Sequence, residues 1–166
     1  MPERTTVRRA RRDKRQGKSA STQAGEFVRE EMLHIRAGKH GARNTKQAIA
    51  IGLSKARRSG VALAPPKKGT ASAKTRRAAK RALTRGKRRH ASASPTRSRA
   101  VSGVLKREGR RSASRSSLAR HARSSARKRS SAQRSAAARK AVRTKGATRR
   151  SASARKAART RARQAR

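Results

Sequence analysis

Histidines, carboxylates and serines are the side chains in this sequence that could carry a proton, hold a metal ion or attack a substrate. The four histidines are His34, His40, His90 and His121, and only six residues are acidic. No histidine stands with a carboxylate or a second histidine at the spacing expected of metal ligands, so we expect surface histidines and no metal site. Cysteine is absent, which excludes thiolate ligands, disulfides and a cysteine nucleophile.

The sequence contains no recognisable set of catalytic residues. The many serines have no set of histidine and aspartate partners, and Gly38-Lys39-His40-Gly41 lacks the Gly-Lys-Ser/Thr ending of a phosphate-binding loop. We therefore predict a protein that is not an enzyme and that uses no cofactor.

Positive charge dominates the remaining chemistry. The 166 residues include 52 Lys and Arg against 6 Asp and Glu, a formal net charge of +46. Because self-repulsion of this size opposes compaction, a polyanionic partner is expected. Phe27 is the single aromatic residue, so the base-stacking platforms of single-strand and sequence-specific RNA-binding modules are missing. Contact with backbone phosphates is the binding mode that remains. Such binding is tight, salt-sensitive and independent of base sequence.

Large apolar residues are sufficient for one small folded unit. Leu, Ile, Val and Phe total 16 of 166 residues, and nine of them lie in residues 26–63. This fraction is below the roughly 20% under which a highly charged chain is expected to stay disordered. We expect a mostly disordered chain around a small all-α unit at 22–64. No apolar run is long enough for a secretory signal or a membrane span, so we expect a cytoplasmic protein with no membrane partner.

A first helix is predicted over 23–37. Ala24, Val28, Met32 and Ile35 recur at helical spacing, and Gly38 stands where a left-handed C-cap would fall. The acidic residues of this helix are expected on an outer, solvated face of mixed charge. They are Glu26, Glu30 and Glu31.

A second helix is predicted over 45–59. Asn44 and Gln47 have the spacing of a capping box, and Gly60 ends the helix. Gly52 inside this helix indicates close passage of a neighbouring helix rather than a ligand site. The two helices form a helical hairpin of helix-turn-helix type, which is marginal alone and could need a homodimer or nucleic acid to hold it.

The segments on either side of the hairpin are polycations of low complexity. Residues 1–21 are expected to form a disordered basic arm, and residues 65–166, with 36 Lys and Arg and one acid, a disordered tail. Partial helix formation is expected when this tail binds its partner. A weak repeat, Ala138–Thr144 returning as Ala154–Thr160, lies within it.

The predicted phosphate contacts follow these basic segments. On the hairpin they are Lys39, Arg43, Lys46, Arg57 and Arg58. In the first part of the tail they are Lys74, Arg76, Arg77, Lys80, Arg81, Lys87, Arg88 and Arg89. In its last part they are Arg127, Lys128, Arg129, Arg139, Lys140, Arg143, Arg155, Lys156, Arg159 and Arg163.

Two resemblances to known families indicate the source of the protein and its place in the cell. In composition, residues 65–166 resemble the C-terminal domain of linker histones and bacterial histone-like proteins rich in Ala, Lys, Arg and Ser, and Ser94-Pro95-Thr96-Arg97 resembles the Ser-Pro-basic turns of linker-histone tails. Residues 26–64, through Glu26-Phe27-Val28, Gly38 to Arg43 and Thr45 to Ser54, resemble a short bacterial domain of unassigned function. The resemblances imply a nucleoid-associated protein of bacterial origin.

The function predicted from the sequence is therefore that of a histone-like protein. It would bind duplex DNA without sequence specificity and condense the chromosome by neutralising phosphates. Two alternatives stay open: an RNA-binding or ribosome-associated basic protein, and a protein-interaction hairpin that its tail anchors to nucleic acid.

Overall fold

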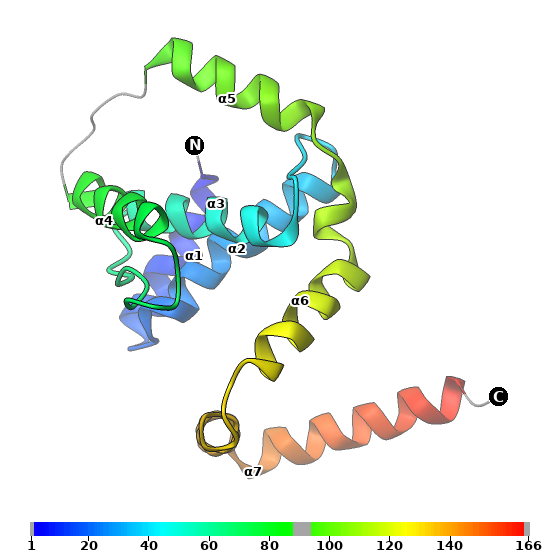
Figure 1. Ribbon diagram of the computed structural model, residues 1–166. Helices are drawn as coiled ribbons and strands as arrows, with labels where there is room; N and C mark the ends of the chain where they lie inside the picture. Colours follow the sequence, from blue (N-terminus) through cyan, green and yellow to red (C-terminus); the bar gives the residue numbers. More distant parts are fainter. Residues whose placement is uncertain (1, 88–93, 165–166) are drawn as a thin grey trace. The chain divides into compact units, whose positions relative to one another are not determined.

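The computed structural model describes residues 2–87 and 94–164, and every regular element in them is a helix (Figure 1). Seven α-helices and one 3-10 helix follow one another in the described residues. By its internal contacts the chain divides into an N-terminal unit, Met1–His121, and a C-terminal unit, Ala122–Arg166. The expectation of a mostly disordered chain is therefore wrong. None of the described helices has the length and apolar character needed to cross a membrane.

The two helices of the expected hairpin are α2 (Ala20–Arg36) and α3 (Thr45–Arg58). The Asn44 side chain accepts a hydrogen bond from the Gln47 N–H at 2.9 Å, as the capping-box spacing predicts. Gln47 in turn accepts from the backbone N–H of Arg43, one residue before the cap. Gly38 has a φ of 75°, which confirms the left-handed end of α2.

Gly52 brings α2 and α3 into close contact. A Cβ built on Gly52 would lie 2.7 Å from the Cα of Val28 on α2, which is too short for a real contact. The helices can cross at this distance only because Gly52 has no side chain. The interpretation of Gly52 as a close-packing residue is confirmed.

Residues 1–21 do not form a disordered arm, because α1 (Arg4–Arg15) packs against α2. Thr6 and Ala10 on its inner face are 0% and 4% exposed. Val7 packs against the core cluster that contains Phe27 and Ala56. A helix rich in arginine thus has one narrow face of buried residues, which packs against α2.

The segment after Pro66 also belongs in part to the folded unit. Helix α4 (Ala73–Lys87) packs on α3 and buries Ala79 and Ala82. A Cβ on Gly86 would collide with the carbonyl oxygen of Arg57, so this contact again needs a glycine. The prediction of a disordered tail beginning at residue 65 is wrong for this segment.

A second stretch of the expected tail is bonded to the loop between α2 and α3. Helix α5 (Pro95–Arg107) is followed by the 3-10 helix η1 (Arg110–Ala113) and by α6 (Arg115–Arg127). The N–H of Gly41 donates to the carbonyl of Leu105 at 2.8 Å, and that of Ala42 donates to Gly109 at 3.2 Å. Ala113, fully buried, joins Met32 and Ile35 in a second core cluster.

The core is built mainly from alanine. Eight of the twelve buried apolar residues in the described segments are alanines. Counting only Leu, Ile, Val and Phe therefore underestimates what this chain can bury, because alanine fills the space between closely approaching helices. The added elements α1, α4 and η1 supply burial that the hairpin alone lacks. Dimerisation through the hairpin stays a prediction.

The C-terminal unit contains α7 (Ser131–Gln164), which bends sharply at Gly146 with φ 69° and ψ 167°. Two helical segments result, 131–145 and 147–164, and the two copies of the internal repeat lie one in each. No described residue of α7 is buried. The expected disorder of this segment is wrong, because a helix forms, and every described residue of this helix is exposed.

Candidate nucleic-acid interface

Five of the six acidic residues are held in ion pairs inside the N-terminal unit. Glu26 pairs with Arg9 of α1 at 3.0 Å, and Asp13 pairs with Lys18 at 2.7 Å. Glu3 lies 2.8 Å from His34 Nε2 and 3.4 Å from Lys39 Nζ. The Glu26 and Glu3 pairs tie α1 and the residue before it to α2 and to the loop after α2, whereas the Asp13 pair ties α1 to the loop before α2.

The remaining two of these five acids are buried. Glu30 and Glu31 are 3% and 0% exposed, whereas a solvated outer face was expected. Lys55 of α3 lies between them, with its Nζ 2.6 Å from Glu31 and 3.9 Å from Glu30. Burial of a carboxylate is tolerated only when a partner compensates its charge, and Lys55 is that partner. The prediction of an outer face of mixed charge is wrong for these residues.

The structure also corrects the prediction for the histidines. Ligand-type atoms of Glu31, His34 and His40 all lie within 4.8 Å of one another, and His40 Nε2 is 3.4 Å from Glu31. The signal was present in the sequence, because Glu31 and His34 are three residues apart and so share a helix face. Two imidazoles and a carboxylate form a ligand set that Zn²⁺ uses.

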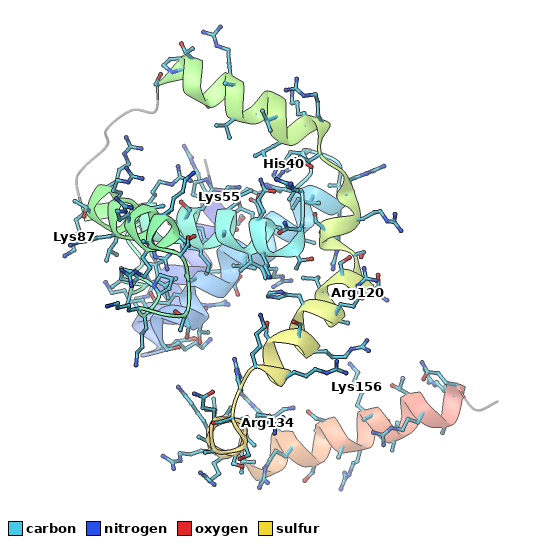
Figure 2. All side chains as sticks on the ribbon, in the orientation of Figure 1. His40, Lys55, Lys87, Arg120, Arg134 and Lys156 are labelled. Carbon is cyan, nitrogen blue, oxygen red and sulfur yellow. The ribbon has the colours of Figure 1, made fainter. Side chains whose placement is uncertain are left out.

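Lys55 argues against a metal ion in this cluster. Its ammonium already supplies the positive charge at Glu31, and a divalent cation would have to displace it (Figure 2, where Lys55 and His40 are labelled). His34 is engaged with Glu3 as well. We therefore interpret the cluster as a set of ion pairs that joins α3 to α2 through Lys55 and stabilises the fold.

Glu3 shows the effect of these contacts on titration. The hydrogen bond from His34, and then that from Lys39, lower the pKa of the Glu3 carboxyl below its usual value. The carboxylate therefore stays ionised, and the ion pairs stay in place, further into the acidic range.

The hairpin residues predicted to contact phosphates divide into two groups. Lys39, Arg43, Lys46 and Arg58 are exposed, as an interface requires. Arg57 is 6% exposed, and its guanidinium donates to the carbonyls of Leu63 and Ala64 at 3.0 and 3.2 Å. Burial lowers the pKa of Arg57. Its guanidinium holds the chain after α3 in place, so we leave it out of the candidate interface.

The predicted cations of α4 lie on its surface. All are exposed except Arg76, which is half-buried. The exposed ones are Lys74, Arg77, Lys80, Arg81 and Lys87. Arg88 and Arg89 fall outside the described residues.

The predicted cations of the C-terminal unit are all exposed. They are Arg127, Lys128, Arg129, Arg139, Lys140, Arg143, Arg155, Lys156, Arg159 and Arg163. Side chains project from all sides of both α7 segments, with Arg134 and Lys156 labelled in Figure 2. No described residue of α7 is buried, so all of its described cations are accessible from solvent.

Sequence reasoning missed one group of residues. Arg43 and Lys46 share a pocket with Arg111, Arg120 and His121, none of which was predicted. These residues lie more than 60 positions further along the chain, in a segment expected to be disordered. No local pattern could have placed them beside the hairpin.

Comparison with known proteins gives no relative from which a role could be transferred: no family model, curated protein or solved structure matches this chain.

Proposed function

We propose that the protein binds duplex DNA through the phosphate backbone, without reading base sequence, and compacts it as a nucleoid component. The observation that carries the proposal is the distribution of charge in the C-terminal unit. It contains 17 of the 52 Lys and Arg residues and none of the acidic ones. Because the unit has no acidic residue, these cations have no side-chain counter-ion within it, and all described side chains of α7 are exposed.

Phosphates are the partner whose chemistry fits this unit. Like charges four residues apart, such as Arg155 and Arg159, repel one another on a free helix. A polyphosphate removes the repulsion and releases its own condensed counter-ions on binding. Two helical segments joined at Gly146 could follow a phosphate backbone independently.

The burial of Phe27 favours backbone contact over recognition of unstacked bases. It is the single aromatic residue of the chain, and it is 1% exposed. No Phe, Tyr or Trp ring is therefore free to stack on a base, the contact on which single-strand binders depend. Duplex RNA remains the rival ligand, because it presents phosphates as well.

The proposal is tested by measuring the affinity of the full chain for a DNA duplex at several salt concentrations. Replacing Arg139, Arg143, Arg155 and Arg159 with Gln should reduce the slope of log K against log[salt] by about three to four, since each phosphate contact contributes about 0.9. The matched control replaces the same four residues with Lys, which preserves the charge and should preserve the slope.

Compaction and ligand choice need two further measurements. Light scattering should report a smaller hydrodynamic radius of plasmid as protein is added. Competition between duplex DNA and structured RNA at about 0.15 M salt should favour DNA. A clear preference for RNA, or binding that ignores salt, would contradict the proposal.

A further inference from the structure

A pocket of about 430 Å³ lies where α3 begins. One wall is the start of α3, from Arg43 to Lys46, and the other comes from η1 and α6. The second wall contributes Arg111, Ser112, Ser117, Arg120 and His121. All of these residues belong to the N-terminal unit. The volume is within the range of small-molecule sites.

The pocket is positively charged on every side. Four of its lining residues are Lys or Arg, and no lining residue is acidic. None of Arg43, Lys46, Arg111 and Arg120 forms an ion pair with a carboxylate of the described residues, although most acids of this unit are paired. Figure 2 shows Arg120 projecting from α6. A cluster of cations is left here without counter-ions.

The start of α3 adds oriented N–H groups. The Asn44 side chain accepts a hydrogen bond from the N–H of Gln47. The N–H groups of Thr45 and Lys46 have no acceptor within α3, because no carbonyl of the helix lies four residues before them. The first turn of α3 contains no acidic residue. The dipole of this 14-residue helix therefore points its positive end at the pocket without a compensating carboxylate.

Ser112 provides an independent indication of a ligand. The residue is 7% exposed and lines the pocket, yet its Oγ has no hydrogen-bond partner. The other buried side-chain atoms without such a partner in the described residues all lie in ion pairs: Arg9 with Glu26, and Glu30 and Glu31 with Lys55 or His40. Ser112 Oγ is the exception, and buried hydroxyls without a partner are rare.

Ser112 is also fixed in place. Its carbonyl oxygen accepts a hydrogen bond from Thr45 Oγ1 at 2.7 Å, which ties η1 to the first residue of α3. Next to it, the carbonyl of Ala113 accepts from Arg36 Nε at 2.8 Å. The hydroxyl is thus held beside the helix terminus by contacts that do not use it.

We propose that this pocket is a phosphate-binding site and that, resting on the function proposed above, its occupant is a phosphodiester group of the DNA backbone. Arginine side chains, N-terminal N–H groups and a serine hydroxyl are the donors that proteins direct at phosphate oxygens. Such a contact carries no base information, but it fixes the position of the N-terminal unit on the duplex. The C-terminal unit supplies affinity, and the pocket orients the folded unit.

The site is tested on the full chain, labelled with ¹⁵N, by titration with inorganic phosphate at constant ionic strength. Saturable shifts of the Thr45, Lys46 and Ser112 amide signals are expected, while the amides of α7 shift little. Replacing Ser112 with Ala should weaken this binding several-fold without loss of the fold, which thermal melting checks. Shifts spread evenly over all basic segments, or no effect of Ser112→Ala, would overturn the site.

The DNA arm uses two variants of equal charge. One carries Arg111→Gln and Arg120→Gln in the pocket, and the control carries Arg8→Gln and Arg12→Gln, which are exposed on α1 and do not line the pocket. The pocket variant should bind duplex DNA about tenfold more weakly than the control. Equal weakening would overturn the DNA contact at the pocket.

The outcomes separate the two proposals. If no version of the chain binds DNA while phosphate still shifts the pocket amides, the proposed function fails and the phosphate site stands. If DNA binding persists and the pocket does not respond to phosphate, the site fails and the proposed function stands.

Discussion

The N-terminal and C-terminal units are both strongly basic, but they differ in whether acidic residues pair with their cations. The N-terminal unit contains all six acidic residues, and five of them sit in ion pairs with cations or histidines. The C-terminal unit contains none. Where acids are present, cations become part of a fold, as Lys55 does between Glu30 and Glu31. Where they are absent, the cations have no acidic side chain of their own unit to pair with.

The comparison also concerns packing. In the N-terminal unit, alanines and glycines let helices approach closely enough to bury a core. Alanine is even more frequent in α7, at 11 of 34 residues against 20 of 121 in the N-terminal unit, yet no described residue of α7 is buried. Small residues alone therefore do not produce tertiary structure, because the core also needs anchors such as Phe27 and Ile35.

The largest expected effect is that of removing Lys55, the cation that pairs with two buried carboxylates of the N-terminal unit. Lys55→Ala leaves Glu30 and Glu31 buried without their ammonium partner. The free energy of unfolding should fall by about 3–5 kcal/mol, measured by urea denaturation with circular dichroism. Arg58→Ala, an exposed change on the same helix, should alter it by less than about 0.5 kcal/mol. Similar losses in both variants would contradict the stabilisation of the fold by the Lys55 ion pairs.

A smaller effect is expected at the helix crossing. Gly52→Ala places a methyl group against the backbone of Val28, and overpacking of this kind costs about 1–3 kcal/mol. Gly25 on α2 is the matched control, because a Cβ there meets nothing within 4 Å. Gly25→Ala should therefore stabilise the unit by up to about 1 kcal/mol. Thermal melting compares the two, and stabilisation by both changes would contradict close packing at Gly52.

The bend in the C-terminal unit is expected to respond in the opposite direction. Gly146 adopts a positive φ, and a Cβ built on it would meet nothing within 4 Å. Alanine disfavours this conformation and favours a helix by about 1 kcal/mol, so Gly146→Ala should raise the helical ellipticity. The melting temperature of the N-terminal unit should not change, because nothing in that unit is touched. Reduced ellipticity would indicate that the bend itself holds the two segments.

The smallest effect concerns pH and Glu3. Because its pKa is lowered in the folded state, the stabilisation from Glu3 is present above the unfolded pKa and is lost as pH falls through the folded one. Glu3→Gln should therefore flatten the dependence of the melting temperature on pH between about pH 3 and 5. A variant that keeps the full dependence of the melting temperature on pH would contradict this role of Glu3.

Local signals predicted local structure well. The cap at Asn44, the left-handed Gly38 and the close contact at Gly52 were all readable, because each depends on residues adjacent in sequence or on the requirements of one helix. The prediction of disorder was wrong, since the count of large apolar residues ignored the alanines that α1, α4 and η1 bury.

The sequence by itself determined the net charge, its concentration in a segment without acids, the near absence of aromatics and the bounds of the central helices within a few residues. Only the tertiary structure decided that Glu30 and Glu31 point inward, that Arg57 serves the fold, and that Arg43 and Lys46 meet Arg111, Ser112 and Arg120 in one pocket. The reason is physical. Composition and spacing fix what a residue can do locally, whereas burial and the meeting of distant cations depend on which helices pack together.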